Sequence, residues 1–534
     1  MAQRPRVAYM GRQHDPVRSA IDRRRFVQLC AGSLAAAAVG CGRRRDRQST
    51  QSRVTVLSIG DERIFLQDYW GMEATYLMFL PLVTLEGDEY GELRRVLAER
   101  WEHSEDYREW TFFLRKDVKW HDGVRVTAHD VKFTMDLRNH PALLGERADR
   151  YSVEIVDDFT FTVTYKKPTD GLDRWSVYYP KHLLDSLDPK EFWTWDFWTH
   201  PVGNGPYRYV RHVPKTMVEV EANPDYYRGK PRIETVVLKF AQEPSVTELL
   251  SGNVDALTYV NRDVLLNLAG DDRFRSYYWW GEWLEAIYWN HRNPLFRHSE
   301  IRRALTMAIN RRELANVLNY PDGVPIMDAI TTRRQFRQGL YPEPLPYDPE
   351  RARTLLEGEG WRDTDGDGVR KRDGEEFRFT AVAVGENENI ATYVQDQFRR
   401  IGVRMEIQVV DISIVRRRLL RTGDFDAIIG RFSNSTTQPN FGSVRMFGED
   451  SPFGYANPEM IRLLNLAKDA IDADDRDRIY QEIMPIFIAD LPITLLLPQV
   501  QTHIAHRRIK GLKSLYRADP VWFMEDLWLD DRSD

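Results

Sequence analysis

Two short stretches, far apart in the chain, follow the same pattern of a helix, a glycine stop and a strand entered through Asp-Ala. They are "ELLSGNVDAL" at residues 248–257 and "RLLRTGDFDAII" at residues 418–429. Glycine often ends a helix because it adopts the left-handed backbone conformation at little steric cost. Each stretch is typical of the second half of a βα unit in a mainly parallel sheet, so the repeat predicts two separate α/β lobes.

Residues 402–430 extend the second stretch into a complete unit. The segment "VRMEIQV" is typical of a strand, "SIVRRRLLRTG" of a helix and "FDAIIG" of a second strand. A chain of 534 residues exceeds the size that a single core supports, so we expect two or three domains. A cleft between two lobes is a common place for a small ligand to bind.

Several helices are predicted from periodicity and capping. Residues 301–309 carry apolar side chains at i, i+3, i+4, i+7 and i+8, and Asn310 with Glu313 starts a further helix. The pairs Asp348-Pro349 and Asn457-Pro458 each place a capping side chain before a first-turn proline. Pro485 within "QEIMPIFIAD" predicts a kink or an early end of its helix.

The segment "KWHDGVRVTAHD", residues 119–130, holds two histidines and two aspartates, which raises the possibility of a metal or acid/base site. Local structure explains the same residues: strand 118–120, a turn at Gly123, strand 124–126, and a helix capped by Thr127 and Asp130. A metal site would need the two histidines to converge from different elements. We therefore predict a hairpin with His121 and Asp122 at its tip, followed by a helix with His129 in its exposed first turn.

The N-terminus reads "DRRRFVQLCAGSLAAAAVGC", residues 22–41. Arg23 and Arg24 precede an Ala-rich run that is too short to span a bilayer, and the segment resembles a twin-arginine export signal. Its end, "AVGC", is similar to a lipobox, in which Cys41 receives a lipid anchor. We expect residues 1–41 to be a lipoprotein signal and residues 42–53 to be a flexible tether; a basic tail on a cytosolic protein is the alternative.

Composition excludes some classes of function. The formal net charge is −6, and the predicted signal holds more arginines than acids, so the exported body is more acidic still. This charge argues against a nucleic-acid partner. Both cysteines, Cys30 and Cys41, lie in the predicted signal, which leaves no internal disulfide framework. The spacings G-x-S-x-G, H-E-x-x-H and the P-loop do not occur, so a secreted hydrolase has no motif to support it.

One long segment resembles a known family. The stretch "LAERWEHSEDYREWTFFLRKDVKWHDGVRVTAHDVKFTMD", residues 97–136, is similar to the signature region of the family 5 extracellular solute-binding proteins. These are the dipeptide, oligopeptide and nickel receptors of ABC importers. "PVGNGPYRY" at residues 201–209 and "NPDYYRGKPRIETVVLKF" at residues 223–240 continue the likeness, which covers residues 54–515.

The resemblance implies a periplasmic-binding-protein-like α/β fold of the class II type, with two lobes, an inserted domain and a ligand cleft between the lobes. The implied boundaries are residues 52–92, 201–290 and 501–534 for lobe I, 93–200 for the inserted domain and 291–500 for lobe II. The implied function is capture of a solute by hinge closure and delivery to a membrane permease, with no chemistry and no cofactor. A ligand-sensing receptor subunit without transport is the alternative.

The resemblance also bears on the ligand. Peptide-binding relatives hold the ligand's α-amino group with an acid in the loop after the "DFDA" strand, whereas this chain has no acid between Asp426 and Glu449. A buried ammonium would lack its compensating charge there, which argues against a peptide with a free amino end and leaves a peptide-like or oligosaccharide-like solute. The candidate ligand-binding residues are Trp279, Trp280, Trp283, Arg431, Phe432, Asn434 and Gln438. Core packing is the alternative for the tryptophans, and a solvated loop is the alternative for the others.

The segment "DTDGDGVRKRDG", residues 363–374, is similar to a calcium loop. Asp363, Asp365 and Asp367 occupy positions one, three and five, but Gly374 stands where a bidentate acid should close the site. We therefore predict a turn rather than a metal site, with calcium bound by the three aspartates as the alternative.

Overall fold

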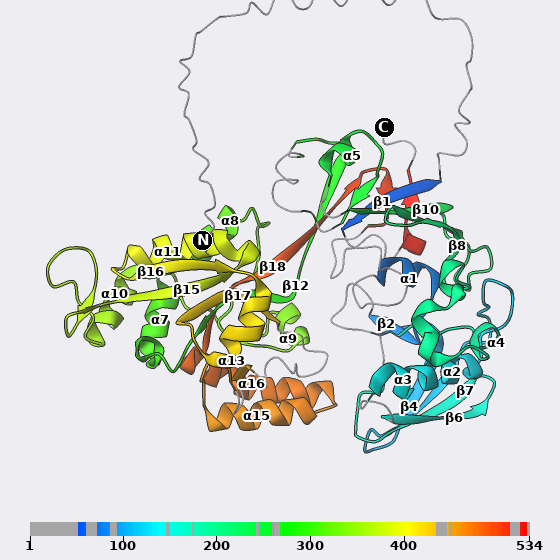
Figure 1. Ribbon diagram of the computed structural model, residues 1–534, viewed down its shortest axis with the longest axis horizontal. Helices are drawn as coiled ribbons and strands as arrows, with labels where there is room; N and C mark the ends of the chain where they lie inside the picture. The colour runs from blue at the N-terminus through cyan, green and yellow to red at the C-terminus, as the bar shows by residue number, and fades with distance from the viewer. Residues whose placement is uncertain are drawn as a thin grey trace, which may run out of the picture. The chain divides into compact units, whose positions relative to one another are not determined.

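The computed structural model describes residues 52–59, 72–85, 93–145, 150–172, 176–241, 245–258, 260, 268, 270–433, 446–447, 451–512 and 524–530, and Figure 1 shows their arrangement. The predicted export signal, with Arg23, Arg24 and Cys41, lies outside these residues. Among the described helices, none combines the length and apolar character needed to cross a lipid bilayer.

Ten strands form the largest sheet, in the order β16-β15-β17-β12-β18-β11-β1-β10-β9-β8. Their bounds are β1 (Arg53–Ile59), β8 (Tyr207–Val213), β9 (Met217–Ala222), β10 (Thr235–Ala241), β11 (Ala256–Leu257), β12 (Phe274–Trp289), β15 (Arg378–Val384), β16 (Arg404–Val410), β17 (Ala427–Ser433) and β18 (Ile493–His506). β1 runs parallel to β10 and β11, and β15 runs parallel to β16 and β17. The strands that end the two repeated stretches, β11 and β17, thus each pair in parallel with a neighbour, as the repeat predicted.

The long antiparallel strands β12 and β18 join the two parallel groups, and both are seen at the centre of Figure 1. β18 pairs with β11 near its end, whereas the last part of β12 pairs with β17. Between these regions the register shifts, because Trp280 pairs with Val500 but Leu284 pairs with Pro498. Proline has no amide to donate to a ladder, so Pro498 is suited to an interruption of this kind.

The two repeated stretches make matching contacts. Gly252 and Gly423 both have left-handed backbones, with φ of 73° and 69°. Asp255, before β11, accepts a hydrogen bond from the Thr55 amide of β1 at 2.8 Å. Asp426, before β17, accepts one from the Thr380 amide of β15 at 2.9 Å. In both places, therefore, the aspartate ties the start of one parallel strand to the third residue of its neighbour.

The unit predicted at residues 402–430 is present as β16, a helical connection and β17, and it crosses over β15. The connection consists of α12 (Ile412–Ile414), a π-helical turn (Val415–Leu419) and α13 (Leu420–Thr422). Val415 and Leu419 pack with Val382 on one face of the sheet. α11 (Glu388–Arg399) packs its apolar side chains with Ala381 on the other face. The connections that follow β15 and β16 thus cover opposite faces.

The capped helices predicted from the sequence are confirmed. Asn310 accepts a hydrogen bond from the Glu313 amide at 3.1 Å, and Asp348 accepts one from the Arg351 amide at 2.8 Å. The helices concerned are α7 (Ser299–Met307), α8 (Arg311–Val317), α10 (Pro349–Gly358) and α15 (Pro458–Asp469). An early end at Pro485 is wrong, because α16 (Ala473–Asp490) continues through it.

A second sheet of four strands has the order β4-β5-β7-β6. Its strands are β4 (Ala98–His103), β5 (Glu109–Leu114), β6 (Tyr151–Asp157) and β7 (Thr160–Tyr165). The helices associated with this part of the chain are α2 (Ala128–Arg138), α3 (Pro141–Leu144) and α4 (Lys181–Leu184), with 3-10 turns at Pro189–Thr194 and Asp196–Thr199. α2 begins with the predicted capping box, in which Asp130 accepts from the Thr127 amide at 2.9 Å.

The remaining elements are short. The helices are α1 (Met72–Met78), α5 (Val246–Leu250) and α9 (Arg333–Gln338), with 3-10 turns at Pro294–Phe296 and Gly385–Asn387. The strand pairs are β2 (Val83–Leu85) with β3 (Leu93–Arg95), β13 (Lys371–Arg372) with β14 (Glu375–Glu376), and β19 (Ile509–Lys510) with β20 (Trp528–Leu529).

Candidate functional site

The topology of the sheet points to the ends of β15 and β17 as a candidate site. Ligands of open α/β sheets bind beyond the carboxyl ends of the strands, at the point where neighbouring connections leave in different directions. β15 and β17 are adjacent and parallel, and the chain after β15 turns through residues 385–387 into α11. Residues 434–438, which follow β17, contain Asn434 and Gln438 and lie outside the described residues.

On one face of the β12–β17 pair, the side chains change from apolar to charged toward the carboxyl end of β17. Ile287 pairs with Ile429 and Trp289 with Ala427, and all four side chains are buried in one core. The next pair on the same face, two residues along each strand, is Glu285 with Arg431. Beyond it stands Trp283, which is 39% exposed. The apolar core therefore ends in an ion pair, and an exposed aromatic side chain follows.

The Arg431 guanidinium donates from Nε to Oε1 of Glu285 at 3.4 Å. The Glu285 side chain is only 4% exposed, whereas that of Arg431 is 34% exposed. The Tyr288 hydroxyl donates to the Arg431 carbonyl at 2.9 Å, and burial raises the pKa of Tyr288. The pair thus places a carboxylate inside the protein and leaves part of a cationic group at the surface.

The structure brings together only some of the predicted ligand-binding residues. Trp283 and Arg431 share a face of the β12–β17 ladder. Trp279 and Trp280 lie in β12 before the register shift, and Phe432 lies in β17; only their backbones are described. Glu285 was missed, although a single charge within the apolar strand segment "WLEAIYW" is a signal for it.

The histidines at residues 119–130 do not converge, which agrees with the predicted turn, but the strands predicted on either side of it are reduced to a single bridge between Lys119 and Arg125. The Gly203 amide donates to Nδ1 of His121 at 3.2 Å, and His121 Nε2 lies 3.1 Å from the Gly205 carbonyl, to which it donates. Burial lowers the pKa of His121 to about 4, and the nearby Arg208 adds to this. His129 is 51% exposed and lies 3.5 Å from Asp158. His121 therefore holds the "HDG" turn against the "GNG" turn.

The two glycines of that second turn are required by close contact with α1. A Cβ added to Gly203 would lie 2.0 Å from the carbonyl oxygen of Met78, and one added to Gly205 would lie 2.6 Å from its carbonyl carbon. Asn204, between them, accepts a hydrogen bond from the Leu80 amide at 2.8 Å. Two motifs that are distant in the sequence thus pack on one another around the end of α1.

The three aspartates of the calcium-like loop do come together, with one oxygen of each within 4.8 Å of the others. The ammonium of Lys371, however, binds Asp365 and lies 2.8 Å from Asp367. These carboxylates raise the pKa of Lys371. The lysine charge thus compensates the charge that a calcium ion would neutralise, and Asp363 accepts from the Gly366 amide at 2.8 Å as in an ordinary turn.

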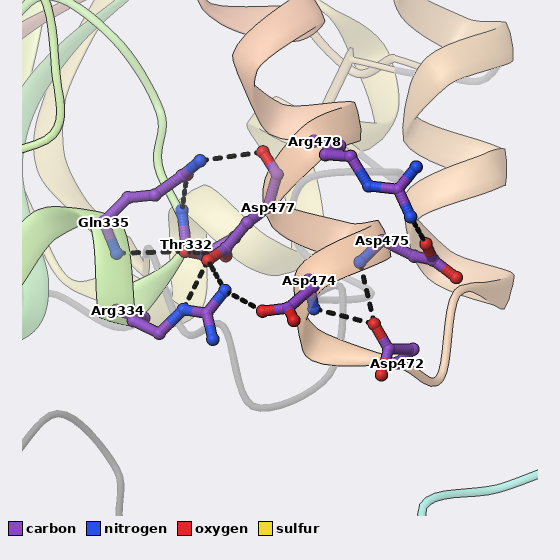
Figure 2. A network of polar contacts seen from close by, with 8 residues as sticks. All are labelled: Thr332, Arg334, Gln335, Asp472, Asp474, Asp475, Asp477 and Arg478. Atoms are coloured by element: carbon purple, nitrogen blue, oxygen red, sulfur yellow. Dashed lines mark hydrogen bonds and ion pairs between the residues drawn. The ribbon is translucent and has the colours of Figure 1, made fainter.

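A polar network joins α9 to the start of α16, as Figure 2 shows. Asp477 accepts from the Thr332 hydroxyl and from Arg334 Nε, both at 2.5 Å. The Gln335 side chain donates to the Asp477 carbonyl at 2.8 Å. The spacing of Thr332 and Gln335 is that of a capping box, which the sequence could have indicated. Since the Asp477 carboxylate is engaged on both oxygens, the network fixes helix packing rather than forming an acid/base site.

Solved structures of binding proteins share the fold. The oligopeptide-binding protein AppA from Bacillus subtilis, in complex with a nonapeptide, matches with a TM-score of 0.64 and 23% identity, covering 90% of this chain and 99% of that chain. NikZ from Campylobacter jejuni, in complex with Ni(L-His), matches with a TM-score of 0.67 and 22% identity at the same coverage. The molecule thus has the two-lobe, periplasmic-binding-protein-like α/β fold that the sequence predicted.

The sequence comparisons identify the family. The model of the bacterial extracellular solute-binding proteins, family 5 (middle region), matches residues 92–453. The oligopeptide-binding protein AppA of Bacillus subtilis (strain 168) is 27% identical over 533 residues, covering 94% of this chain and 96% of that protein. The chain belongs to the family 5 bacterial extracellular solute-binding proteins, as its motifs at residues 97–136 and 201–209 predicted.

Proposed function

We propose that this protein is the substrate-binding lipoprotein of an ABC importer. It captures a peptide-like or oligosaccharide-like solute by closing two lobes around it and delivers the solute to a membrane permease. Family membership supports the binding role, and relatives named as peptide-binding proteins of ABC transporters support the importer. The solute binds at the carboxyl edge of β15 and β17, against Trp283 and Arg431.

The closing motion is inferred from the register shift in the β12–β18 pair. In the proposed division, lobe I consists of residues 52–92, 201–290 and 501–534, lobe II of residues 291–500, and residues 93–200 form an inserted domain. By these bounds β12 is the last strand of lobe I and leads into lobe II, and β18 begins in lobe II and ends in lobe I. A break in the ladder between the two halves is a suitable hinge, because a few residues there can change backbone angles while both halves keep their own hydrogen bonds.

A solute can favour the closed state only by as much as it binds that state more tightly than the open one. Polar contacts and an aromatic surface that become enclosed on closure supply this difference. The mixture of Trp283 and the Glu285–Arg431 pair suits a ligand with both apolar and polar parts. It offers no carboxylate dedicated to an ammonium group, which agrees with a solute that lacks a free amino end.

Native mass spectrometry of freshly purified protein tests the binding role. We expect a mass above that of the polypeptide, released on denaturation and identified as a peptide-like or oligosaccharide-like molecule. A peptide with a free amino end would contradict the ligand class. Turnover of a substrate by the purified chain would contradict the function itself.

The anchor is tested separately. The proposal requires export through Arg23 and Arg24 and lipidation of Cys41. Cys41→Ser should move the protein from the membrane fraction to the soluble exported fraction, and Arg23→Lys with Arg24→Lys should retain it in the cytoplasm. Membrane retention of the Cys41→Ser variant would refute the lipid anchor. Loss of solute uptake on deletion of the protein distinguishes import from ligand sensing.

A further inference from the structure

We propose that Arg431 is the specificity-determining residue of the site and binds a carboxylate group of the solute, with Glu285 as its positioning residue. This inference rests on the proposed function and narrows its ligand to an anionic solute. It follows from where a buried charge stands in the β12–β17 ladder and from which end of the ion pair reaches the surface.

The position of Glu285 is unusual for a glutamate. It lies in a central strand between Leu497 of β18 and Arg431 of β17, and the residue as a whole is 3% exposed. Enclosing a carboxylate costs several kcal/mol unless a partner compensates it, and an apolar residue would continue the core at lower cost. Packing alone therefore does not explain a charged residue at the end of this apolar face.

The two side chains of the pair differ in exposure, and this difference indicates which of them meets the ligand. Glu285 is enclosed, and the contact at Nε, 3.4 Å long, holds one side of the guanidinium. A guanidinium carries five N–H donors in a rigid plane, so it can engage a second partner while keeping the first. With 34% of the Arg431 side chain exposed, the arginine and not the glutamate is presented to an arriving ligand.

Charge and neighbouring surface select the ligand. Glu285 fixes the orientation of the guanidinium, and a planar arginine pairs with carboxylates in a bidentate manner. A ligand ammonium would instead meet the guanidinium before it could reach the enclosed Glu285. Trp283, on the same face and 39% exposed, offers an apolar surface beside the charge. The site therefore fits a solute with a carboxylate next to a flat or apolar group.

The test compares ligands that differ only in the carboxylate. We would offer the purified protein an equimolar mixture of acetylated tetrapeptides as C-terminal acids and as C-terminal amides, and in parallel oligogalacturonides and their methyl esters. Retained molecules are counted by mass spectrometry. We expect the wild-type protein to prefer the acid member of at least one pair by tenfold or more, and Arg431→Gln to lose that preference.

Three further variants separate recognition from structure. Glu285→Gln with Arg431→Gln removes both charges together, so its melting temperature should recover relative to Arg431→Gln alone while the preference stays lost. Glu285→Gln keeps the Arg431 cation but removes the charge that orients it. This variant should retain a weakened preference for the acid. Arg404→Gln removes an arginine from β16 that is paired with Glu376, and should leave the preference unchanged.

Retention of acids and neutral analogues in equal amounts by the wild-type protein would overturn the inference and leave the proposed function intact. A preference that survives Arg431→Gln would overturn it as well. If the protein retains no member of either pair, the inference is overturned as well. The proposed function is contradicted only if the native mass spectra also show no bound solute.

Discussion

Acid should destabilise this protein in part through His121. Its pKa in the folded protein is lowered from 6.5 to about 4, because burial between the two turns disfavours the charged form. In the unfolded chain the imidazole has its ordinary pKa. As the pH falls from 6.5 toward 4, the unfolded chain binds a proton that the folded protein excludes, so the free energy of unfolding decreases with falling pH.

The size of the effect follows from the two pKa values. The full loss is about 3 kcal/mol, of which about 2.5 kcal/mol falls between about pH 7.5 and about pH 4.5. His121→Gln removes the titration and keeps a donor for the Gly205 carbonyl, but it takes the acceptor from the Gly203 amide. The variant should therefore be less stable at neutral pH by about 1–3 kcal/mol and less sensitive to acid.

Urea unfolding at both pH values measures this difference. His291, whose pKa burial also lowers to about 4, and the carboxylates titrate in both proteins and cancel in the comparison. We expect the wild-type protein to lose about 2.5 kcal/mol more than the variant over the interval. His129→Gln, at a position that is 51% exposed, is the matched control and should follow the wild-type curve. Parallel curves for wild type and His121→Gln would refute the reasoning.

Three other predictions concern single contacts. Asp328→Ala leaves Arg311 buried without its carboxylate and should lower the free energy of unfolding by about 3–5 kcal/mol, whereas Arg311→Met with Asp328→Leu should cost less; equal losses in denaturant titrations would contradict this. Gly203→Ala should lower the melting temperature or the soluble yield, because its Cβ would lie 2.0 Å from a carbonyl oxygen of α1, and an unchanged melting curve would oppose it. Lys371→Met should gain a calcium-dependent rise in melting temperature that the wild-type protein lacks, and a similar rise in both would show that the lysine does not occupy the cation position.

Local features of the fold could be predicted from the sequence. Caps such as Asn310 and Asp348 depend on a contact with a residue only three positions away. Gly252 and Gly423 end their helices through the conformation of a single residue. The early end at Pro485 failed for a non-local reason. A proline inside a helix costs about 3 kcal/mol, but burial of side chains on the same helix, such as Phe487, offsets that cost.

The site itself was only partly predictable. Trp283 and Arg431 were identified as candidates, but Glu285 was not, because its role depends on a partner 146 residues away in the chain. Strand register places the two side chains opposite one another, and no local pattern specifies the register between strands so distant. The matching hydrogen bonds of Asp255 and Asp426 escaped prediction for the same reason.

The central claim is that two lobes close around a solute by bending at the β12–β18 break. Spin labels at Glu221 of β9 and Arg462 of α15, introduced as cysteines after replacement of Cys30 and Cys41, report the separation of the lobes by pulsed electron resonance. The measurement compares the protein stripped of solute with the same protein after the solute identified by mass spectrometry has been added back. We predict that the distance distribution becomes shorter and narrower when the solute is bound. An unchanged distribution with solute demonstrably bound would contradict the account.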